Sequence, residues 1–288
     1  MAQRALDELI ALLDLEEIEV NVFRGRSPAE PRQRVFGGQV AGQALVAAAR
    51  TVERGGVHSL HAYFLRPGDV GKPILYQVDR IRDGKTFTTR RVLAIQHGRP
   101  IFGLSASFQP PEDGPDHQAP MPDAPDPESL PTWAERAQQI IAKVKNPEMR
   151  EWLQRERPID TRNVDDRRIG EKRKRPPRQL VWVRANGTLP DALTLHQCVM
   201  TYASDMTLLD TATLPHAMAW NDPNYLMASL DHAMWFHRPF RADEWLLYAQ
   251  ESPSASGARG FAIGHFFTRS GTLVASVVQE GLMRPLKT

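Results

Sequence analysis

The sequence predicts an α+β protein made of two tandem units, each with a long helix packed in an antiparallel sheet. The first observation is an internal repeat, since residues 59–67 and 229–239 are variants of one segment that ends in Arg-Pro. The second is that a helix-like run precedes each copy and strand-like runs follow it, the last reaching Gln109 or Gln279. Because the connections between runs are short, neighbouring strands must be antiparallel. Such a repeat predicts two copies of one fold sharing a sheet or an interface.

The length of 288 residues allows about two domains, each with its own core. We predict a first unit at residues 1–112, a linker with short helices and a basic run at 113–178, and a second unit at 179–288. The linker prediction rests on a stretch rich in proline and aspartate that begins at Pro110, followed by helical patterns over 133–145 and 147–155.

Composition limits the class of protein. Hydrophobic residues make up 41% and charged residues 24%, which is ordinary for a globular protein. A net charge of +2 is too small to predict a nucleic-acid partner. The single cysteine, Cys198, excludes an internal disulfide framework and fits a reducing compartment. No run has the length of a membrane span, and the N-terminus lacks a secretory apolar segment, so we expect a cytoplasmic protein.

The first unit opens with a helical pattern between Leu6 and Leu13, and residues 18–22 then alternate as in a half-buried strand. Next, Gly37 and Gly38 lead into a helix of small and apolar residues that we expect to be buried. The glycines have two interpretations: a turn whose N–H groups face a ligand at a helix N-terminus, or a tight turn and nothing more. The expected strands are 59–66, 74–82, 86–96 and 100–109.

Ahead of the second unit lies a basic run of four residues, Lys172, Arg173, Lys174 and Arg175. Charge runs are usually solvated surface, and that is the first interpretation. The second is contact with an anionic ligand. The low net charge favours a small molecule that carries phosphate over a nucleic acid.

The helix of the second unit carries a carboxylate on its apolar face. The stripe that defines this face is Leu195, Val199, Tyr202, Met206 and Leu209. Asp205 follows Tyr202 by three residues and precedes Leu209 by four, so it shares their face. Desolvation there raises the pKa of a carboxyl unless hydrogen bonds or a cation offset it. Asp205 is thus either a structural hydrogen-bond acceptor or a functional carboxylate.

Two further polar residues are expected near that helix. Gln279 follows three apolar residues on one face of the last strand, so it is predicted to point inward. Ser229 starts the strand that runs through Phe236. His232 and His237 lie on opposite faces of this strand because they are five residues apart, which favours structural roles over a metal site.

The whole chain resembles the acyl-CoA thioesterase II family, which folds as a double hotdog. The segments that carry the resemblance are Arg34–Gln39, Tyr63–Gly68, Tyr202–Asp205, Leu230–Pro239 and Gln279–Gly281. The resemblance implies that Asp205, Ser229 and Gln279 form the catalytic network. Serine stands at 229 where threonine also occurs in the family, and it keeps the hydroxyl without the methyl that restricts rotation.

The resemblance further implies an acyl-CoA substrate, no cofactor and no metal. We expect Asp205 to act as a base on a water that Ser229 and Gln279 position, with Gly37 and Gly38 as candidate oxyanion donors. A nucleophilic Ser229 is the alternative within this mechanism. The rival functions are a hotdog enoyl-CoA hydratase and a non-catalytic acyl-CoA-binding protein. The basic run is the candidate site for the CoA phosphates, and exposed strand edges predict a homo-oligomer.

Overall fold

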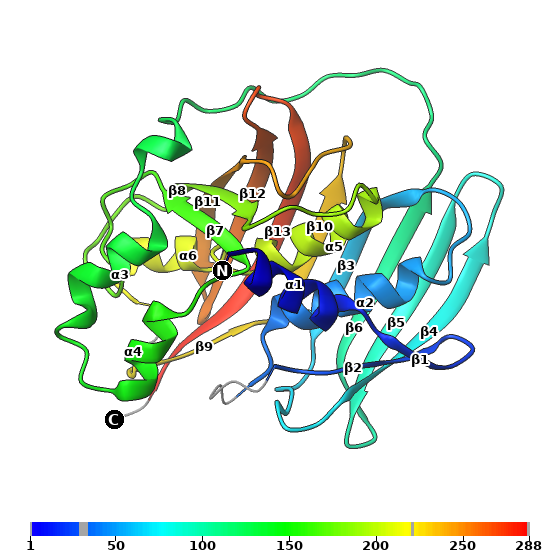
Figure 1. Cartoon of the computed structure of the whole chain (residues 1–288), viewed down its shortest axis with the longest axis horizontal. Helices are drawn as coiled ribbons and strands as arrows, with labels where there is room; N and C mark the ends of the chain where they lie inside the picture. Colours follow the sequence, from blue (N-terminus) through cyan, green and yellow to red (C-terminus); the bar gives the residue numbers. More distant parts are fainter. Residues whose placement is uncertain (1, 29–33, 220–221, 287–288) are drawn as a thin grey trace.

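The computed structural model describes residues 2–28, 34–219 and 222–286. Within them, one 13-stranded antiparallel sheet curves around two central helices, α2 and α5 (Figure 1). The order of strands across the sheet is β1-β2-β4-β5-β6-β3-β10-β13-β12-β11-β8-β7, and β9 pairs with β13. Each central helix therefore lies against its own half of a shared sheet, which is the double-hotdog arrangement that the sequence predicts.

The elements fall into three groups along the chain. Those of the first unit are α1 (Ala2–Leu13), β1 (Glu16–Glu19), β2 (Val22–Gly25), α2 (Gly37–Ala49), β3 (Gly56–Phe64), β4 (Ile74–Asp83), β5 (Thr88–Gln96) and β6 (Arg99–Gln109). The connecting segment holds η1 (Pro127–Ser129), α3 (Trp133–Ile141), α4 (Pro147–Gln154) and β7 (Ile159–Asn163). The second unit contains β8 (Arg178–Ala185), α5 (Leu193–Ser204), α6 (Asp210–Thr213), η2 (Leu214–His216), β9 (Tyr225–Ser229), β10 (Asp231–Phe236), β11 (Leu246–Ser256), β12 (Arg259–Thr268) and β13 (Leu273–Pro285).

The two units join where β3 pairs with β10, the repeated segments that the sequence singles out. Leu60 lies opposite Met234, and Ala62 lies opposite His232. All four side chains are buried on the inner face of the sheet. Of the two predicted arrangements, a shared sheet or a shared interface, the structure therefore confirms the shared sheet.

The helices α2 and α5 pack against each other with almost no side chain between them. A Cβ at Gly38 would lie 2.4 Å from the carbonyl oxygen of Tyr202, and one at Gly42 would lie 3.3 Å from that of Cys198. Since residue numbers rise along α2 as they fall along α5, the helices are antiparallel. The N-terminus of α2 therefore meets the C-terminus of α5.

Two sequence predictions about local structure are wrong. Residues 18–22 form a hairpin between β1 and β2 rather than one strand, because Asn21 adopts a left-handed conformation (φ 61°) that asparagine tolerates. Ile18 and Val20 are consequently 46% and 68% exposed. The helical stripe through Leu209 is also interrupted, since α5 ends at Ser204 and Asp205 is its C-cap.

The connecting segment covers the outer face of the second unit's sheet. Its long extended part arches across the molecule (Figure 1), and Met121, Ala124 and Leu130 pack on the buried side chains of Trp182 and Leu247. The same segment contributes β7, which pairs with β8 at the sheet edge. The boundaries at residues 112 and 178 stay a prediction. Across the described ranges, no helix is long and apolar enough to cross a membrane.

We expect fragments 1–112 and 113–288 to be poorly soluble when expressed separately and soluble when co-expressed. Alone, the first fragment exposes the β3 edge and the face of α2 that contacts α5. Solubility and hydrogen exchange of each fragment check this. A soluble, monomeric 1–112 fragment with native-like amide protection would contradict it.

Candidate active site

Three polar side chains meet beside the C-terminus of α5. The Gln279 Nε2 donates hydrogen bonds to Asp205 Oδ1 at 2.6 Å and to Ser229 Oγ at 2.9 Å. The Ser229 hydroxyl donates to the same Asp205 oxygen at 3.3 Å. The structure therefore brings together the three residues that the sequence singles out.

The sheet places Gln279 and Ser229 through a shared partner strand. Ser229 is the last residue of β9 and lies opposite Gly281 on β13, two positions after Gln279. The N–H of Leu230 then bonds to the carbonyl of Glu280, and the chain continues as β10. Ser229 thus ends β9 rather than starting the strand through Phe236, and its hydroxyl bonds to Asp205.

The first unit supplies a hydrogen-bond donor to the same site. The helix α2 begins at Gly37, so both predicted glycines lie in its first turn rather than before it. The backbone N–H of Gly38 donates to the Asp205 carboxylate. A Cβ at Gly37 would come within 2.7 Å of both Asp205 Oδ2 and the Phe64 ring. The close approach therefore requires glycine and sets the carboxylate at the positive end of a helix.

Burial dominates the electrostatics of the site. It raises the pKa of Asp205 to about 6, although hydrogen bonds from Gln279, Gly38 and Ser229 act in the opposite direction. At neutral pH the carboxylate is mostly ionised, with a basicity well above that of an exposed aspartate. Such a group can take a proton from water during attack.

The amide of Gln279 has one atom left for another partner. Its side chain is fully buried, and its Nε2 is committed to Asp205 and Ser229. The remaining Oε1 is buried and has no hydrogen-bond partner among the described residues. Since buried acceptors are normally satisfied, this oxygen marks where a water or substrate group would bind.

The two histidines lie on opposite faces of the sheet. His232 is buried and its Nε2 lies 2.8 Å from Ser204 Oγ, while burial lowers its pKa to about 4. His237 is exposed and bonds to Ser276 Oγ at 2.8 Å. Asp231 accepts from the N–H of Glu280 at 2.6 Å. No cluster of three or more metal-ligating side chains occurs in the part of the chain that the structure describes.

Two of the four residues in the basic run form ion pairs. Lys172 forms an ion pair with Asp222 at 2.8 Å, and Arg175 bonds to Asp166 and Glu171 at 2.8 and 2.9 Å. Arg173 and Lys174 are exposed. No described contact joins this run to Asp205, Ser229 or Gln279.

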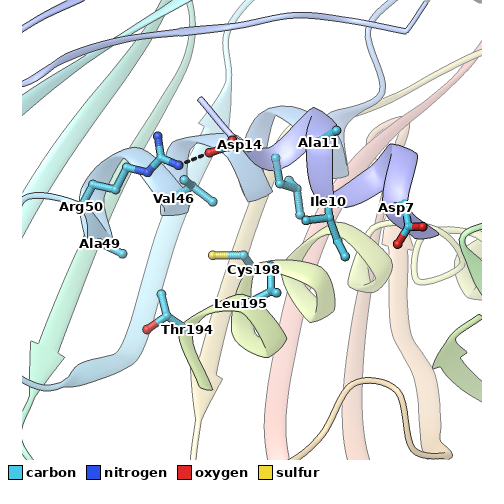
Figure 2. Close-up of a pocket in the computed structure, with 11 residues that line it drawn as sticks. Asp7, Ile10, Ala11, Asp14, Val46, Ala49, Arg50, Thr194, Leu195 and Cys198 are labelled. Carbon is cyan, nitrogen blue, oxygen red and sulfur yellow. Dashed lines mark hydrogen bonds and ion pairs between the residues drawn. The ribbon is translucent and has the colours of Figure 1, made fainter. Parts of the chain in front are cut away.

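A separate cavity lies at the other end of the helix pair. It has a volume of about 570 Å³ and is bounded by α1, α2 and α5, with apolar side chains that include Ile10, Val46 and Leu195 (Figure 2). At its rim Arg50 pairs with Asp14. None of the three polar site residues lines it, so this cavity is separate from the site.

Sequence reasoning missed the groups that hold the end of α5. The Tyr248 hydroxyl donates to the carbonyl oxygen of Ser204 at 3.0 Å, directly before Asp205. The sequence does contain one signal for Tyr248: a tyrosine recurs on equivalent strands of the two units, at residue 76 on β4 and at residue 248 on β11. Both are buried, and Tyr76 donates its hydroxyl to Gln43 on the other central helix.

The fold and the site together define a double-hotdog protein with a half-buried carboxylate, a half-buried hydroxyl and a buried amide between its two units. Two family models match the chain: an acyl-CoA thioesterase N-terminal domain over residues 26–109 and an acyl-CoA thioesterase over residues 153–282. The chain belongs to the acyl-CoA thioesterase II family.

Individual relatives agree with this assignment over nearly the whole chain. Human acyl-coenzyme A thioesterase 8 is 43% identical, covering 95% of this chain and 88% of its own. Acyl-CoA thioesterase 2 of Haemophilus influenzae is 40% identical, covering 97% and 98%. The crystal structure of the acyl-CoA thioesterase II TesB2 from Mycobacterium marinum is 46% identical with a TM-score of 0.80, covering 98% and 99%.

We expect Asp205→Asn to increase the free energy of unfolding at pH 8. Because the folded pKa lies near 6 and the unfolded value near 3.8, the folded protein holds the proton more tightly. Stability contributed by this group is therefore full below pH 3.8 and is lost as the pH rises through 6, by about 3 kcal/mol at most. Asparagine does not titrate, so its advantage should grow over that window. Denaturant unfolding of both proteins at pH 4 and pH 8 checks this. The prediction is contradicted if the free energy of unfolding of the variant, minus that of wild type, is smaller at pH 8 than at pH 4.

Proposed function

We propose that the protein hydrolyses acyl-CoA thioesters to a free fatty acid and CoA through direct attack by water. The observation that carries this proposal is the hydrogen-bonded triangle of Asp205, Ser229 and Gln279 at the N-terminus of α2, in which Gln279 is buried and the other two residues are half-buried. Family membership and relatives named acyl-CoA thioesterases support the same substrate class.

In this mechanism Asp205 is the general base. Water attacks the thioester carbonyl carbon while its proton passes to Asp205, and a tetrahedral intermediate forms. Collapse of the intermediate breaks the carbon–sulfur bond, and the CoA sulfur leaves with the proton that Asp205 held. Ser229 and the free Oε1 of Gln279 orient the water, which lowers the entropic part of the barrier.

The geometry favours water over Ser229 as the nucleophile. A serine nucleophile is normally activated by a neighbouring histidine. The buried histidine on the adjoining strand, His232, bonds instead to Ser204. Ser229 itself bonds to Asp205 and Gln279, which suits a positioning group.

The rival functions make different products. A hydratase dyad of Asp231 and His232 is not favoured, because these side chains bond to different partners, Glu280 and Ser204. The test is a thiol-trapping dye with saturated and α,β-unsaturated acyl-CoA substrates. Hydrolysis releases a free thiol from both, whereas hydration releases none and a carrier forms no product. Acyl-CoA consumed without thiol release would overturn the proposal.

We expect Ser229→Thr to keep most of the wild-type turnover, because threonine retains the hydroxyl. Ser229→Ala should lose turnover, about 100-fold or less, without loss of fold. Steady-state kinetics, circular dichroism and intact-mass spectrometry of the reacting enzyme check this. An acyl-enzyme adduct that disappears in Ser229→Ala would instead establish covalent catalysis.

We propose that the basic run binds the CoA phosphates, with Arg173 and Lys174 making the contacts since Lys172 and Arg175 are in ion pairs. Arg173→Ala with Lys174→Ala should raise the Michaelis constant for acyl-CoA and weaken its salt dependence. A short thioester without the nucleotide serves as the control substrate and should be unaffected. Equal effects on both substrates, or none, would exclude the run from the site.

We further propose that the protein is cytoplasmic and self-associates. Tyr63, Leu75 and Ile81, on strands β3 and β4, are 65%, 41% and 55% exposed. The connecting segment covers the outer face of the second unit's sheet, whereas these side chains of the first unit are uncovered in the monomer. Exposed apolar side chains of this size on a sheet are typical of an interface.

A further inference from the structure

The residue before Asp205 is held by two side chains that the proposed reaction does not use. The Ser204 hydroxyl donates to the carbonyl of Thr201 at 2.9 Å, and the same oxygen lies 2.8 Å from His232 Nε2. The Tyr248 hydroxyl donates to the Ser204 carbonyl at 3.0 Å. We call Ser204, His232 and Tyr248 the Ser204 clamp. All three are buried, and they join α5 to β10 and β11.

Each contact of the clamp has a defined direction. Since the single hydroxyl proton of Ser204 goes to Thr201, His232 must donate from Nε2 to the serine oxygen. The other ring nitrogen, Nδ1, is then an unprotonated acceptor, and it is buried with no hydrogen-bond partner in the described part of the chain. His232 therefore serves as a neutral donor and is not placed to move a proton in the reaction.

The clamp acts where a helix is weakest. The last carbonyls of a helix lack partners within the helix, so its final turn frays unless other groups satisfy them. Ser204 is the last residue of α5, and Tyr248 satisfies its carbonyl. Tyr248 is itself fixed, because its ring stacks on Phe266 with centroids 3.8 Å apart.

Fixing this turn matters because the carboxylate of Asp205 must reach three donors at once. Those donors, Gln279, Ser229 and Gly38, come from three other elements, so a displacement of the helix end disrupts all of them. A shift of about 1 Å in a reacting group can cost about 100-fold in rate.

We propose that His232 and Tyr248 are positioning residues for hydrolysis, which act through Ser204 to hold Asp205 in its productive position. This inference rests on the proposed role of Asp205 as the base. Neither residue touches the reacting atoms, so their removal should lower kcat with little change in KM.

The test uses Tyr248→Phe, with Tyr76→Phe as the matched control. Each variant deletes one buried tyrosine hydroxyl from an equivalent strand, but Tyr76 bonds to Gln43 on α2. We expect kcat of Tyr248→Phe to fall about 10-fold with KM within about twofold of wild type. The acid limb of its pH–rate profile should move to higher pH, because the carboxylate loses hydrogen bonds that stabilise its charge. Tyr76→Phe should lose as much thermal stability as Tyr248→Phe but keep the wild-type kcat and the wild-type acid limb of the pH–rate profile.

A second pair of variants shows whether a lower kcat comes from the loss of the hydrogen-bond donor at residue 232 or from general damage to the core. His232→Gln places an amide N–H within reach of Ser204 and should retain most of kcat, whereas His232→Leu should lose it. Equal kcat in the two His232 variants, or wild-type kcat and pH profile in Tyr248→Phe, would overturn the inference. Asp205→Asn in the same assay distinguishes failure of the clamp proposal from failure of the proposal that Asp205 is the base. If Asp205→Asn is active, the assignment of Asp205 as the base fails. If it is inactive while the clamp variants are normal, only the clamp fails.

Discussion

The contact between the N-terminus of α2 and Asp205 at the end of α5 is the constraint on which the rest of the structure depends. The Gly38 N–H reaches the carboxylate because α2 carries no side chain at Gly37 and Gly38, where a Cβ would collide with Asp205 or Tyr202. The antiparallel packing of the helices in turn requires one sheet curved around both, which the β3–β10 pairing provides. The packing of α2 against α5 therefore determines both the shape of the sheet and the position of the site.

Duplication of the unit explains why one chain can build an asymmetric site. Equivalent elements face each other across the junction, but each half brings different side chains to it. The first contributes backbone, glycine and Phe64, and the second contributes Asp205, Ser229 and Gln279. Desolvating a carboxylate is costly for folding, and the hydrogen bonds from Gln279, Ser229 and Gly38 at the helix N-terminus offset part of that cost without removing the raised pKa. The same desolvation that destabilises the fold raises the basicity of Asp205, and this basicity suits the carboxylate to activate water.

Much of the fold could be predicted from the sequence because repeats and periodicity are local signals. The antiparallel sheet, the buried helices and the family assignment are confirmed, and the inward direction of Gln279 followed from alternation along its strand. The predictions failed where tertiary contacts override periodicity. The apolar stripe continues to Leu209, but that side chain packs directly on Gly281, and α5 ends five residues earlier. The contacts that Gly38 and Tyr248 make at the end of α5 join distant segments of the chain, so local spacing could not predict them. The catalytic roles of Asp205, Ser229 and Gln279 stay a prediction.

The central claim is that Asp205, made basic by burial and held between the two units, takes the proton from the attacking water. The most direct measurement is the pH dependence of kcat/KM for wild type and Asp205→Asn with one acyl-CoA substrate. The account predicts a wild-type rate that rises with pH through an apparent pKa of about 6, and a variant that is about 100-fold to 10,000-fold slower and lacks this limb. An Asp205→Asn enzyme with the wild-type limb and near-normal turnover would contradict the account.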